Sequence, residues 1–324
     1  MSRPLLKTYL KGALGLILGA AFSFLAIRQT NFAEVKGVIE GISPRWLLVG
    51  LGCYVLDLGL RTLRWGILVR RVLSVGYAVV GEVLLVGYAV NNILPARLGE
   101  LFRADYMSRQ TDASRSAVLG TIVIERLLDA SMVVLGLGIG LLALNVGGGR
   151  TAAGLRHPVL ILGIGASMLA AAGIALAALG RLRRAPAGRR HWLALAAGNF
   201  ATGLRSLDAS NLAISIVLSI GIWIAEGAAI WCMVRSIGAV LSPGDTMVLL
   251  SIASLSTLLP TAPGYVGSYQ LAFAISFSLF GAAQAQGVAA ATVTQAVLFG
   301  SVTVAGLSAY MGRAAQRMFA RQHG

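Results

Sequence analysis

Six long apolar segments restrict this chain to an α-helical membrane protein. Each has about the 20 predominantly apolar residues that a helix needs to cross the hydrocarbon core of a bilayer. Of the 324 residues, 57% are hydrophobic and 12% are charged, whereas about 25% of the residues in a soluble domain are charged. Lipid must therefore cover much of the surface. The predicted crossings are approximately Tyr9–Ile27, Trp46–Val69, Ala117–Leu144, Pro158–Gly180, Asn211–Ile237 and Gln286–Met311.

Two further apolar stretches are predicted to be re-entrant, entering and leaving the membrane on the same side. The first, Ala78–Leu94, contains Glu82 and the pair Asn91–Asn92. The second, Met247–Leu279, is broken near its middle, and the two arms are each too short to cross. Four helix-breaking residues make this break: Pro260, Pro263, Gly264 and Gly267.

Basic residues predict the orientation. With the N-terminus in the cytoplasm and both stretches re-entrant, two thirds of the 27 Lys and Arg residues fall in cytoplasmic segments, as the positive-inside rule requires. We therefore expect a multi-pass protein of the bacterial inner (cytoplasmic) membrane with both termini cytoplasmic. The net charge of +15 is assigned to membrane orientation and anionic headgroups, and no nucleic acid is expected as a partner.

An internal repeat supports this topology. The string LLVGYAVNNILPARLGE, which starts at Leu84, aligns with LLSIASLSTLLPTAPGY, which starts at Leu249. Each copy would hold three crossings and one re-entrant element, and this odd number makes the second copy inverted, as in many transporters. The prediction is one all-α transmembrane domain over 1–324, with repeat one at about 9–144, repeat two at about 158–311 and a basic cytoplasmic linker at about 181–210.

Ionisable residues inside the predicted crossings are candidates for a functional site. Each costs about 2.5–3.5 kcal/mol on insertion scales, so it is expected to be paired or to face water. In the second crossing, Asp57, Arg61 and Arg64 share one helix face. Asp57 can pair with Arg61, which leaves Arg64 in need of an anion. The repeat aligns Arg61 with Glu226, and the two either meet near the centre of the fold or find separate partners.

The third crossing carries a second charged group. Glu125 and Asp129 share a face, and Arg126 is predicted to point aside. These carboxylates could nearly neutralise Arg61 and Arg64. Two interpretations stay open: a buried ion network that locks helices together, or a cationic pocket for a phosphate headgroup, which an arginine binds through two hydrogen bonds.

The segment Ile93–Arg103 is predicted to have a functional role. Pro95 ends the preceding helix and Gly99 permits an unusual turn. A solvated loop is the alternative, but a plain loop does not need Pro and Gly at the tip of a broken helix. Three charged residues would lie on one side of the arm that follows: Arg97, Glu100 and Arg103.

The second break, Pro260–Gln270, has no charged residue. It offers freed backbone groups, which are tolerated at membrane depth only where they are buried or line a wet cavity. Gating, substrate contact and plain packing all stay open. The candidates for substrate binding are Arg61, Arg64, Asn91, Asn92, Arg97, Glu100, Arg103, Pro260, Gly264 and Gln270. The candidates for a polar network or ion coupling are Asp57, Glu82, Glu125, Arg126, Asp129 and Glu226.

Four strings together resemble the transmembrane region of the lysylphosphatidylglycerol synthase family, a flippase-like domain. They are RTLRW at Arg61, LPARLGELFR at Leu94, ERLLD at Glu125 and PTAPGYVGSYQ at Pro260. The resemblance extends over about residues 45–310 and implies a helical fold with re-entrant segments that translocates a lipid. In the multiple peptide resistance factor of this family, a soluble C-terminal domain aminoacylates phosphatidylglycerol. This chain ends just after its last predicted crossing, so the synthase activity is not expected.

The first functional hypothesis is a flippase for an anionic or phosphate-bearing lipid, such as a phospholipid, a polyprenyl-linked lipid or a hopanoid. No GxxxxGK[ST] string is present, so an ion or lipid gradient would drive it. The alternative is a scaffold that presents lipid to a separate synthase or glycosyltransferase. An enzyme acting on lipid phosphate ranks last, because no catalytic group accompanies the arginines. No cofactor or metal is expected, and a second copy or a lipid-modifying enzyme could be a partner.

Overall fold

The structure confirms a multi-pass helical membrane protein. The computed structural model describes residues 41–94, 98–146, 191–204, 206, 209–258 and 263–323. Within these ranges, four helical segments are long and apolar enough to cross a membrane: α3 (Pro44–Val69), α6 (Arg115–Val146), α9 (Ala209–Ser236) and the run Gln284–Gln316. The predicted crossings Tyr9–Ile27 and Pro158–Gly180 lie outside the described residues, so the total of six stays a prediction.

The last crossing is longer than predicted and is not a regular α-helix throughout. It consists of α12 (Gln284–Thr294), a π-helical turn η4 (Gln295–Phe299) and α13 (Gly300–His323). The prediction ended it at Met311, where the apolar sequence stops. The helix continues because the residues beyond are mostly Ala, Arg, Gln and Met, which are good helix formers although the group is no longer apolar.

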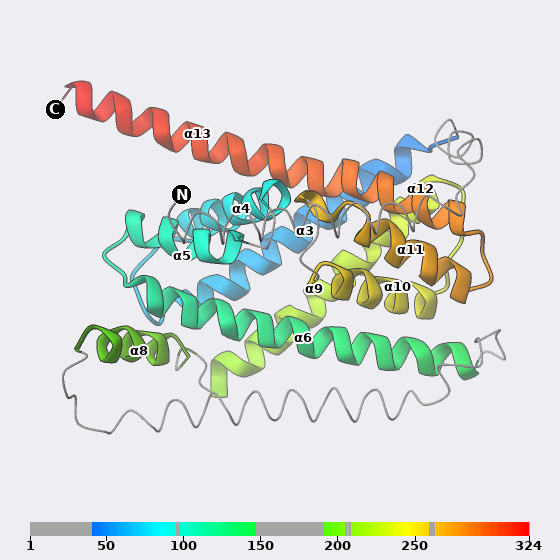
Figure 1. The fold of residues 1–324 in the computed structure, drawn as a ribbon, viewed down its shortest axis with the longest axis horizontal. Coiled ribbons are helices and arrows are strands. Elements are labelled where there is room, and N and C mark those ends of the chain that lie inside the picture. The colour runs from blue at the N-terminus through cyan, green and yellow to red at the C-terminus, as the bar shows by residue number, and fades with distance from the viewer. Residues whose placement is uncertain are drawn as a thin grey trace, which may run out of the picture.

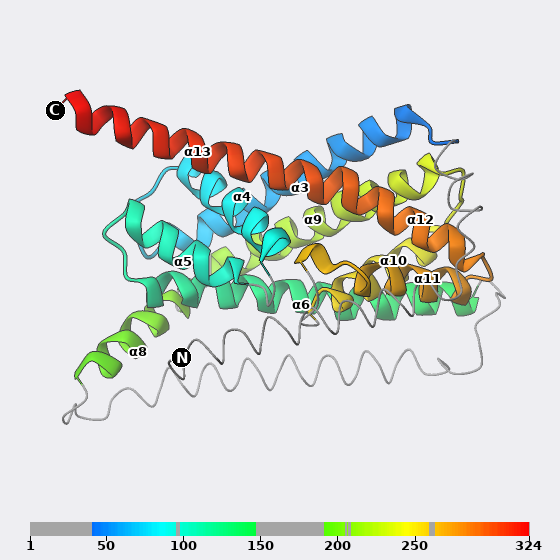
Figure 2. The ribbon, with the colours of Figure 1, turned by 45° about the horizontal axis from the view of Figure 1, so that its top comes forward.

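Each predicted re-entrant stretch belongs to a pair of short helices, but Glu82 and the pair Asn91–Asn92 do not interrupt the first stretch: its helix is continuous and ends at Ile93. The first pair is α4 (Tyr77–Ile93) and α5 (Gly99–Gln110). The second pair is α10 (Pro243–Ser256) and α11 (Ser268–Leu279), with the short η3 (Pro263–Tyr265) between them. Even α4 is only about 26 Å long, less than the roughly 30 Å of hydrocarbon in a bilayer. The pairs lie at opposite ends of the molecule, both between α6 and α13 (Figure 2).

Local sequence explains where the second pair begins. Ser242 and Asp245 form a capping box at the start of α10, with the Ser242 hydroxyl accepting from the Asp245 amide at 3.1 Å and the Asp245 carboxylate accepting from the Ser242 amide at 2.8 Å. The turn before α11 needs left-handed backbone at Gly264 (φ 67°) and Gly267 (φ 90°). Glycine adopts this conformation without the penalty of a Cβ atom.

The element bounds follow the repeat read from the sequence. Helix α9 begins 165 residues after α3 begins, and α10 begins 166 residues after α4. Helices α11 and α12 each begin 169 residues after α5 and α6, respectively. Helices α3 and α9 cross at the centre of the molecule in opposite chain directions, with α6 and α13 on either side (Figure 1).

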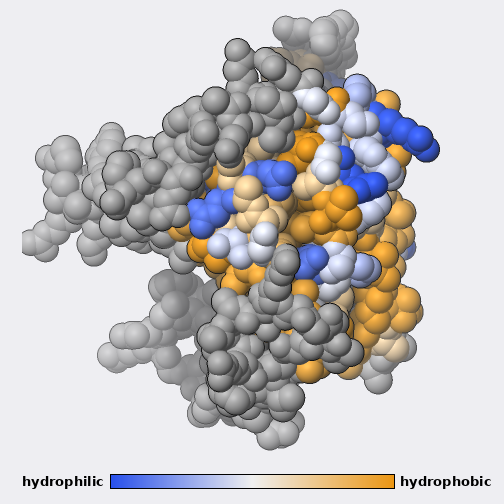
Figure 3. Space-filling view, turned by 90° about the vertical axis from the view of Figure 1, so that its right-hand side faces the viewer, coloured by the Kyte–Doolittle hydropathy of each residue, from blue (hydrophilic) through white to orange (hydrophobic). Residues whose placement is uncertain are grey.

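Helix α3 has apolar residues on its outside and charged residues inside. Leu48, Val55 and Leu56 are 58–70% exposed, whereas Asp57 and Arg64 are at most 1% exposed. This is the reverse of a soluble helix and fits a helix whose outer face contacts lipid. Figure 3 shows the end where α3 begins and α9 ends. Hydrophilic residues lie among hydrophobic ones on the coloured part of this face, and the adjoining flank is largely hydrophobic.

Each half of the described chain has its own hydrophobic core. The first includes Trp65, Val83, Leu84 and Met107 from α3, α4 and α5. The second includes Met233, Leu249, Phe273 and Phe277 from α9, α10 and α11. The charged residues discussed below lie where the two halves meet.

A helix, α8 (His191–Leu204), occupies part of the segment predicted as a basic linker. It packs closely on α6 through glycines from both helices. A Cβ atom on Gly203 would lie 2.1 Å from the Ala117 carbonyl oxygen, and one on Gly120 would lie 2.4 Å from that of Phe200. Small residues allow such close backbone contact between helices in membranes.

Changing Gly203→Ala is therefore expected to lower the melting temperature of the purified protein by several degrees. The added methyl group meets backbone atoms that cannot move away, and overpacking of this kind costs about 1–3 kcal/mol. Gly52→Ala is the matched control, because a Cβ atom there has no neighbour within 4 Å. This control is expected to be neutral or slightly stabilising, since Ala is the better helix former. Equal melting temperatures for the two variants would contradict the close contact.

Candidate functional site

Four arginines and four carboxylates form a connected ion network where the two halves of the protein meet. The arginines are Arg61, Arg64, Arg103 and Arg126, and the carboxylates are Asp57, Glu125, Asp129 and Glu226. They come from α3, α5, α6 and α9, and all eight were predicted site residues. Their formal charges cancel, so the network as a whole has no net charge.

Arg61 joins α3 to α9. Its Nε donates to both oxygens of Asp57 at 2.9 and 3.0 Å, and its Nη2 donates to Glu226 Oε2 at 2.6 Å. The 165-residue offset between Arg61 and Glu226 aligned these two residues in the sequence. Of the two alternatives, the structure confirms that they meet.

Arg64 finds its anion on α6. Its Nη2 donates to Asp129 Oδ1 at 2.6 Å, and its Nη1 donates to the Ser219 hydroxyl of α9 at 2.8 Å. The Arg64 side chain is 0% exposed. Arg61 Nη1 lies 3.9 Å from Asp129 Oδ2, so Asp129 connects the two α3 arginines of the network.

Arg103 is held by a carboxylate and an aromatic ring. Its two terminal amines donate to the two oxygens of Glu125 at 2.8 and 3.4 Å. Its guanidinium carbon lies 4.1 Å from the ring centroid of Trp65, a distance at which a cation is attracted to an aromatic face. Trp65 is itself fixed by a hydrogen bond from its Nε1 to Thr121 Oγ1 at 3.1 Å.

Arg126 does not point aside, and that prediction is wrong. Its Nη2 lies 2.7 Å from Glu125 Oε1 and 3.1 Å from Asp129 Oδ2. Consecutive residues on a helix project about 100° apart, which is why the sequence suggested separation. The long arginine side chain reaches back over that angle to both carboxylates.

The side chains at one edge of the network, called the open edge below, are partly exposed, and those at the other edge are buried. Arg64 and Glu125 have fully buried side chains, whereas those of Glu226 and Arg126 are 26% and 32% exposed. Each arginine already has a carboxylate within hydrogen-bonding distance. The geometry is therefore that of a neutral ion network, in which a phosphate that binds an arginine competes with a carboxylate.

Two neighbouring asparagines at the end of α4 organise the first turn, which connects α4 to α5. Asn91 Oδ1 accepts a hydrogen bond from the amide of Gly99 at 2.7 Å, so it holds the start of α5 against the end of α4. Asn92 Nδ2 donates to the Phe299 carbonyl at 3.2 Å and to Thr303 Oγ1 at 2.9 Å. Asn92 thus binds the π-helical turn η4 and the start of α13. The predicted site residue Arg97 lies outside the described residues.

The second turn, which connects α10 to α11, is hydrogen-bonded to the same π-helical turn η4. Gln270 accepts from the amide of Gly267 at 2.8 Å and donates to the side chain of Gln295. Gln295 in turn donates to the Gly264 carbonyl at 2.8 Å. A Cβ atom on Gly264 would lie 3.6 Å from the Asn92 carbonyl oxygen, so the two turns are adjacent. Such π-helical turns frequently occur at functional sites. Pro260 lies outside the described residues.

Two predicted acidic residues lie elsewhere. Glu82 accepts from Arg313 Nε at 3.0 Å, from the Tyr106 hydroxyl at 2.8 Å and from Gln110 at 3.4 Å. These partners are on α5 and α13, so Glu82 belongs to a separate cluster. Glu100 lies in the first turn of α5, where the helix dipole favours an acidic side chain.

Sequence reasoning missed several residues that position the network and the turns: Trp65, Thr121, Ser219, Gln295 and Thr303. Gln295 gave a signal as an amide inside an apolar crossing, and Trp65 stands in the RTLRW string but was not singled out. Thr121, Ser219 and Thr303 are residue types that are common in membrane helices. Among the residues that the structure describes, no group of three His, Cys, Asp or Glu side chains is placed to hold a metal ion.

Comparisons with known proteins give the following matches. A family model described as "Lysylphosphatidylglycerol synthase TM region" matches residues 12–306. A "UPF0104 membrane protein" of Methanothermobacter thermautotrophicus is 24% identical, over 92% of this chain and 94% of its own length. "Glycosyltransferase AglD" of Haloferax volcanii is 25% identical over 94% of this chain. That alignment covers 54% of AglD, so this chain spans about half of that relative.

Proposed function

Because the family match shows that this chain belongs to the lysylphosphatidylglycerol synthase TM-region family, we propose that it binds a phosphate-bearing membrane lipid and moves it between leaflets. The observation that carries the proposal is the neutral network of eight charges at the crossing of α3 and α9. Ionised side chains at membrane depth are expensive and commonly mark substrate or ion pathways. The two turns next to the π-helix support the proposal, because interrupted helices commonly form transporter sites.

The proposal includes the topology. The two halves form an inverted repeat, and the pairs α4–α5 and α10–α11 are re-entrant. The offsets of the helix bounds and the opposite directions of α3 and α9 support this arrangement.

Both termini are proposed to be cytoplasmic, in the cytoplasmic membrane. The two ends of the molecule differ in the number of described arginines outside the network. More of them lie at the end where α3 ends and α6 begins than at the opposite end, and the positive-inside rule assigns the more basic end to the cytoplasm. They are Arg70, Arg71, Arg109, Arg115 and Arg313, against Arg45 and Arg235 at the other end.

The lipid phosphate would exchange with a carboxylate at the open edge of the network. Glu226 is the candidate to be displaced, because Arg61 keeps Asp57 as a second partner. An incoming phosphate adds negative charge to a neutral network, so protonation of a displaced carboxylate would restore neutrality. This makes a proton gradient a source of energy for transport.

A leaflet assay in proteoliposomes tests the proposal. Fluorescent phosphatidylglycerol is placed in both leaflets, and a membrane-impermeant reductant removes the outer signal. With the protein present, the protected inner fraction should fall, because lipid moves outward to the reductant. Fluorescent phosphatidylcholine measures selectivity for anionic lipid. Equal rates in vesicles with and without protein, for several anionic lipids, would overturn the proposal.

The second candidate function is a scaffold that presents lipid to a separate enzyme. The match to a relative named as a glycosyltransferase, of which this chain covers about half, favours it. It predicts that the protein co-purifies with a lipid-modifying enzyme and moves no lipid alone. In either case, we expect that this chain performs no catalytic step itself.

A further inference from the structure

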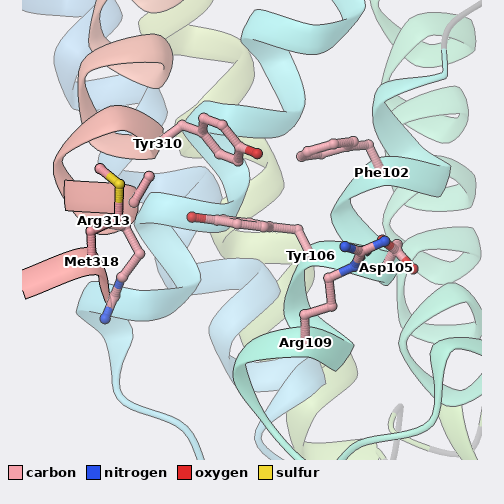
Figure 4. Close-up of a pocket in the computed structure, with 8 residues that line it drawn as sticks. Phe102, Asp105, Tyr106, Arg109, Tyr310, Arg313 and Met318 are labelled. Carbon is pink, nitrogen blue, oxygen red and sulfur yellow. Dashed lines mark ion pairs between the residues drawn. The ribbon is translucent and has the colours of Figure 1, made fainter. Parts of the chain in front are cut away.

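A cleft of about 320 Å³ lies between α5 and the C-terminal part of α13 (Figure 4). Phe102, Tyr106 and Arg109 line one wall, and Tyr310, Arg313 and Met318 line the other. The three aromatic rings are close together, with centroids 5.6 Å apart for Tyr106–Tyr310 and 6.3 Å for Phe102–Tyr310. The volume is within the range of small-molecule sites in proteins.

Helix α5 separates this cleft from the ion network. Phe102, Tyr106 and Arg109 follow a spacing of three and four residues and so share one face of the helix. Arg103 and Met107 are at most 1% exposed, and Arg103 binds Glu125 on α6. The cleft is therefore a second polar site, distinct from the network but built on the same helix.

Each wall supplies an arginine that is still accessible. Arg109 pairs with Asp105 through Nε at 2.6 Å, but 65% of its side chain is exposed. Arg313 pairs with Glu82, and 33% of its side chain is exposed. Arg115 also pairs with Asp105, at 2.7 Å. Among the residues that line the cleft, two are arginines and one, Asp105, is acidic, and this excess of one positive charge favours an anion in the cleft.

The cleft also has the composition of a membrane–water interface. Tyrosine rings and basic side chains are typical of the level where acyl chains meet headgroups. Tyr310 and Met318 are exposed apolar side chains beside the arginines. A ligand that fits both parts has an anionic group attached to an apolar chain.

We propose that this cleft binds the phosphate headgroup of a membrane lipid, with Arg109 and Arg313 contacting the phosphate and the aromatic wall contacting the chain. The proposal rests on the proposed function for the class of ligand, but it does not depend on movement between leaflets. The cleft would be occupied equally in a flippase and in a scaffold.

Charge reversal at one wall tests the proposal, with native mass spectrometry of the protein in detergent as the measurement. Dioleoyl phosphatidylglycerol is titrated into the wild type, Arg109→Glu and Arg115→Glu. The second variant is the matched control, because Arg115 pairs with the same Asp105 and is 63% exposed but does not line the cleft. We expect Arg109→Glu to weaken the tightest binding step at least fivefold and Arg115→Glu to change it less than twofold. Both arginines are exposed, so equal melting temperatures verify folding.

Two further measurements in the same experiment identify the class of ligand. Dioleoyl phosphatidylcholine should bind at least fivefold more weakly than phosphatidylglycerol, and glycerol phosphate at millimolar concentration should not displace the lipid. Equal weakening by both substitutions, or none by Arg109→Glu, would overturn the proposal. Displacement by glycerol phosphate would show a site for a soluble anion and would also overturn it. Loss of transport in the leaflet assay with lipid binding intact would refute the proposed transport alone.

Discussion

Replacing Glu125→Leu is expected to lower the free energy of unfolding by about 3–5 kcal/mol, the usual effect of removing one partner of a buried ion pair. Glu125 is fully buried and binds both Arg103 and Arg126. Arg126 would keep Asp129 and is partly exposed. Among the partners in the described part of the chain, Arg103 would keep only the Trp65 ring, and its uncompensated charge would stay buried. Thermal unfolding in detergent should show a melting temperature lower by on the order of 10 °C.

The double variant Glu125→Leu/Arg103→Met separates the loss of charge balance from the loss of packing. Replacement of a whole buried ion pair by apolar groups is often neutral or stabilising. The double variant is therefore expected to regain most of the lost stability. If it were no more stable than Glu125→Leu alone, the uncompensated Arg103 charge could not be the cause.

Replacing Glu226→Gln is expected to slow lipid movement in the leaflet assay at least tenfold while changing stability little. Glutamine keeps the shape and one acceptor oxygen for Arg61, but the network then carries a net positive charge. A charge-assisted hydrogen bond contributes about 1.5–3 kcal/mol, so a lipid phosphate would be held more tightly and released more slowly. The partial exposure of Glu226 and the second partner of Arg61, Asp57, limit the loss of stability.

Asp245→Asn is the matched control for this prediction. It removes one negative charge from a half-buried residue at the start of α10, where the only assigned role is helix capping. Its leaflet exchange rate should equal that of the wild type. An equal slowing by both substitutions would indicate a general effect of charge and would contradict the role of Glu226.

Periodic and compositional features made the fold predictable in part. Long apolar runs gave the positions of α3, α6 and α9 to within a few residues, because hydrocarbon thickness sets helix length. The repeat brought Arg61 and Glu226 together without any structural information. Proline and glycine located both interruptions, since these residues break helices for local steric reasons.

Contacts between helices distant in sequence could not be predicted in the same way. Nothing local places Arg103 of α5 against Glu125 of α6 and the ring of Trp65, because this contact depends on how three helices pack. The π-helical turn at Gln295–Phe299 has no recognised local pattern. Its hydrogen bonds with Asn92 and Gly264 come from two other segments.

The charged inner face of α3 has a consequence for how the protein is made. Asp57, Arg61 and Arg64 would each be unfavourable in lipid while α3 was alone, and the partners of Arg61 and Arg64 include Glu226 and Ser219 on α9. Those partners are synthesised 165 and 155 residues later, respectively. The charged face of the nascent α3 must therefore be kept from contact with lipid, by α6 or by the insertion machinery, until α9 has been synthesised and inserted. Biogenesis of the first half should depend on synthesis of the second, and a chain stopped before α9 should be degraded.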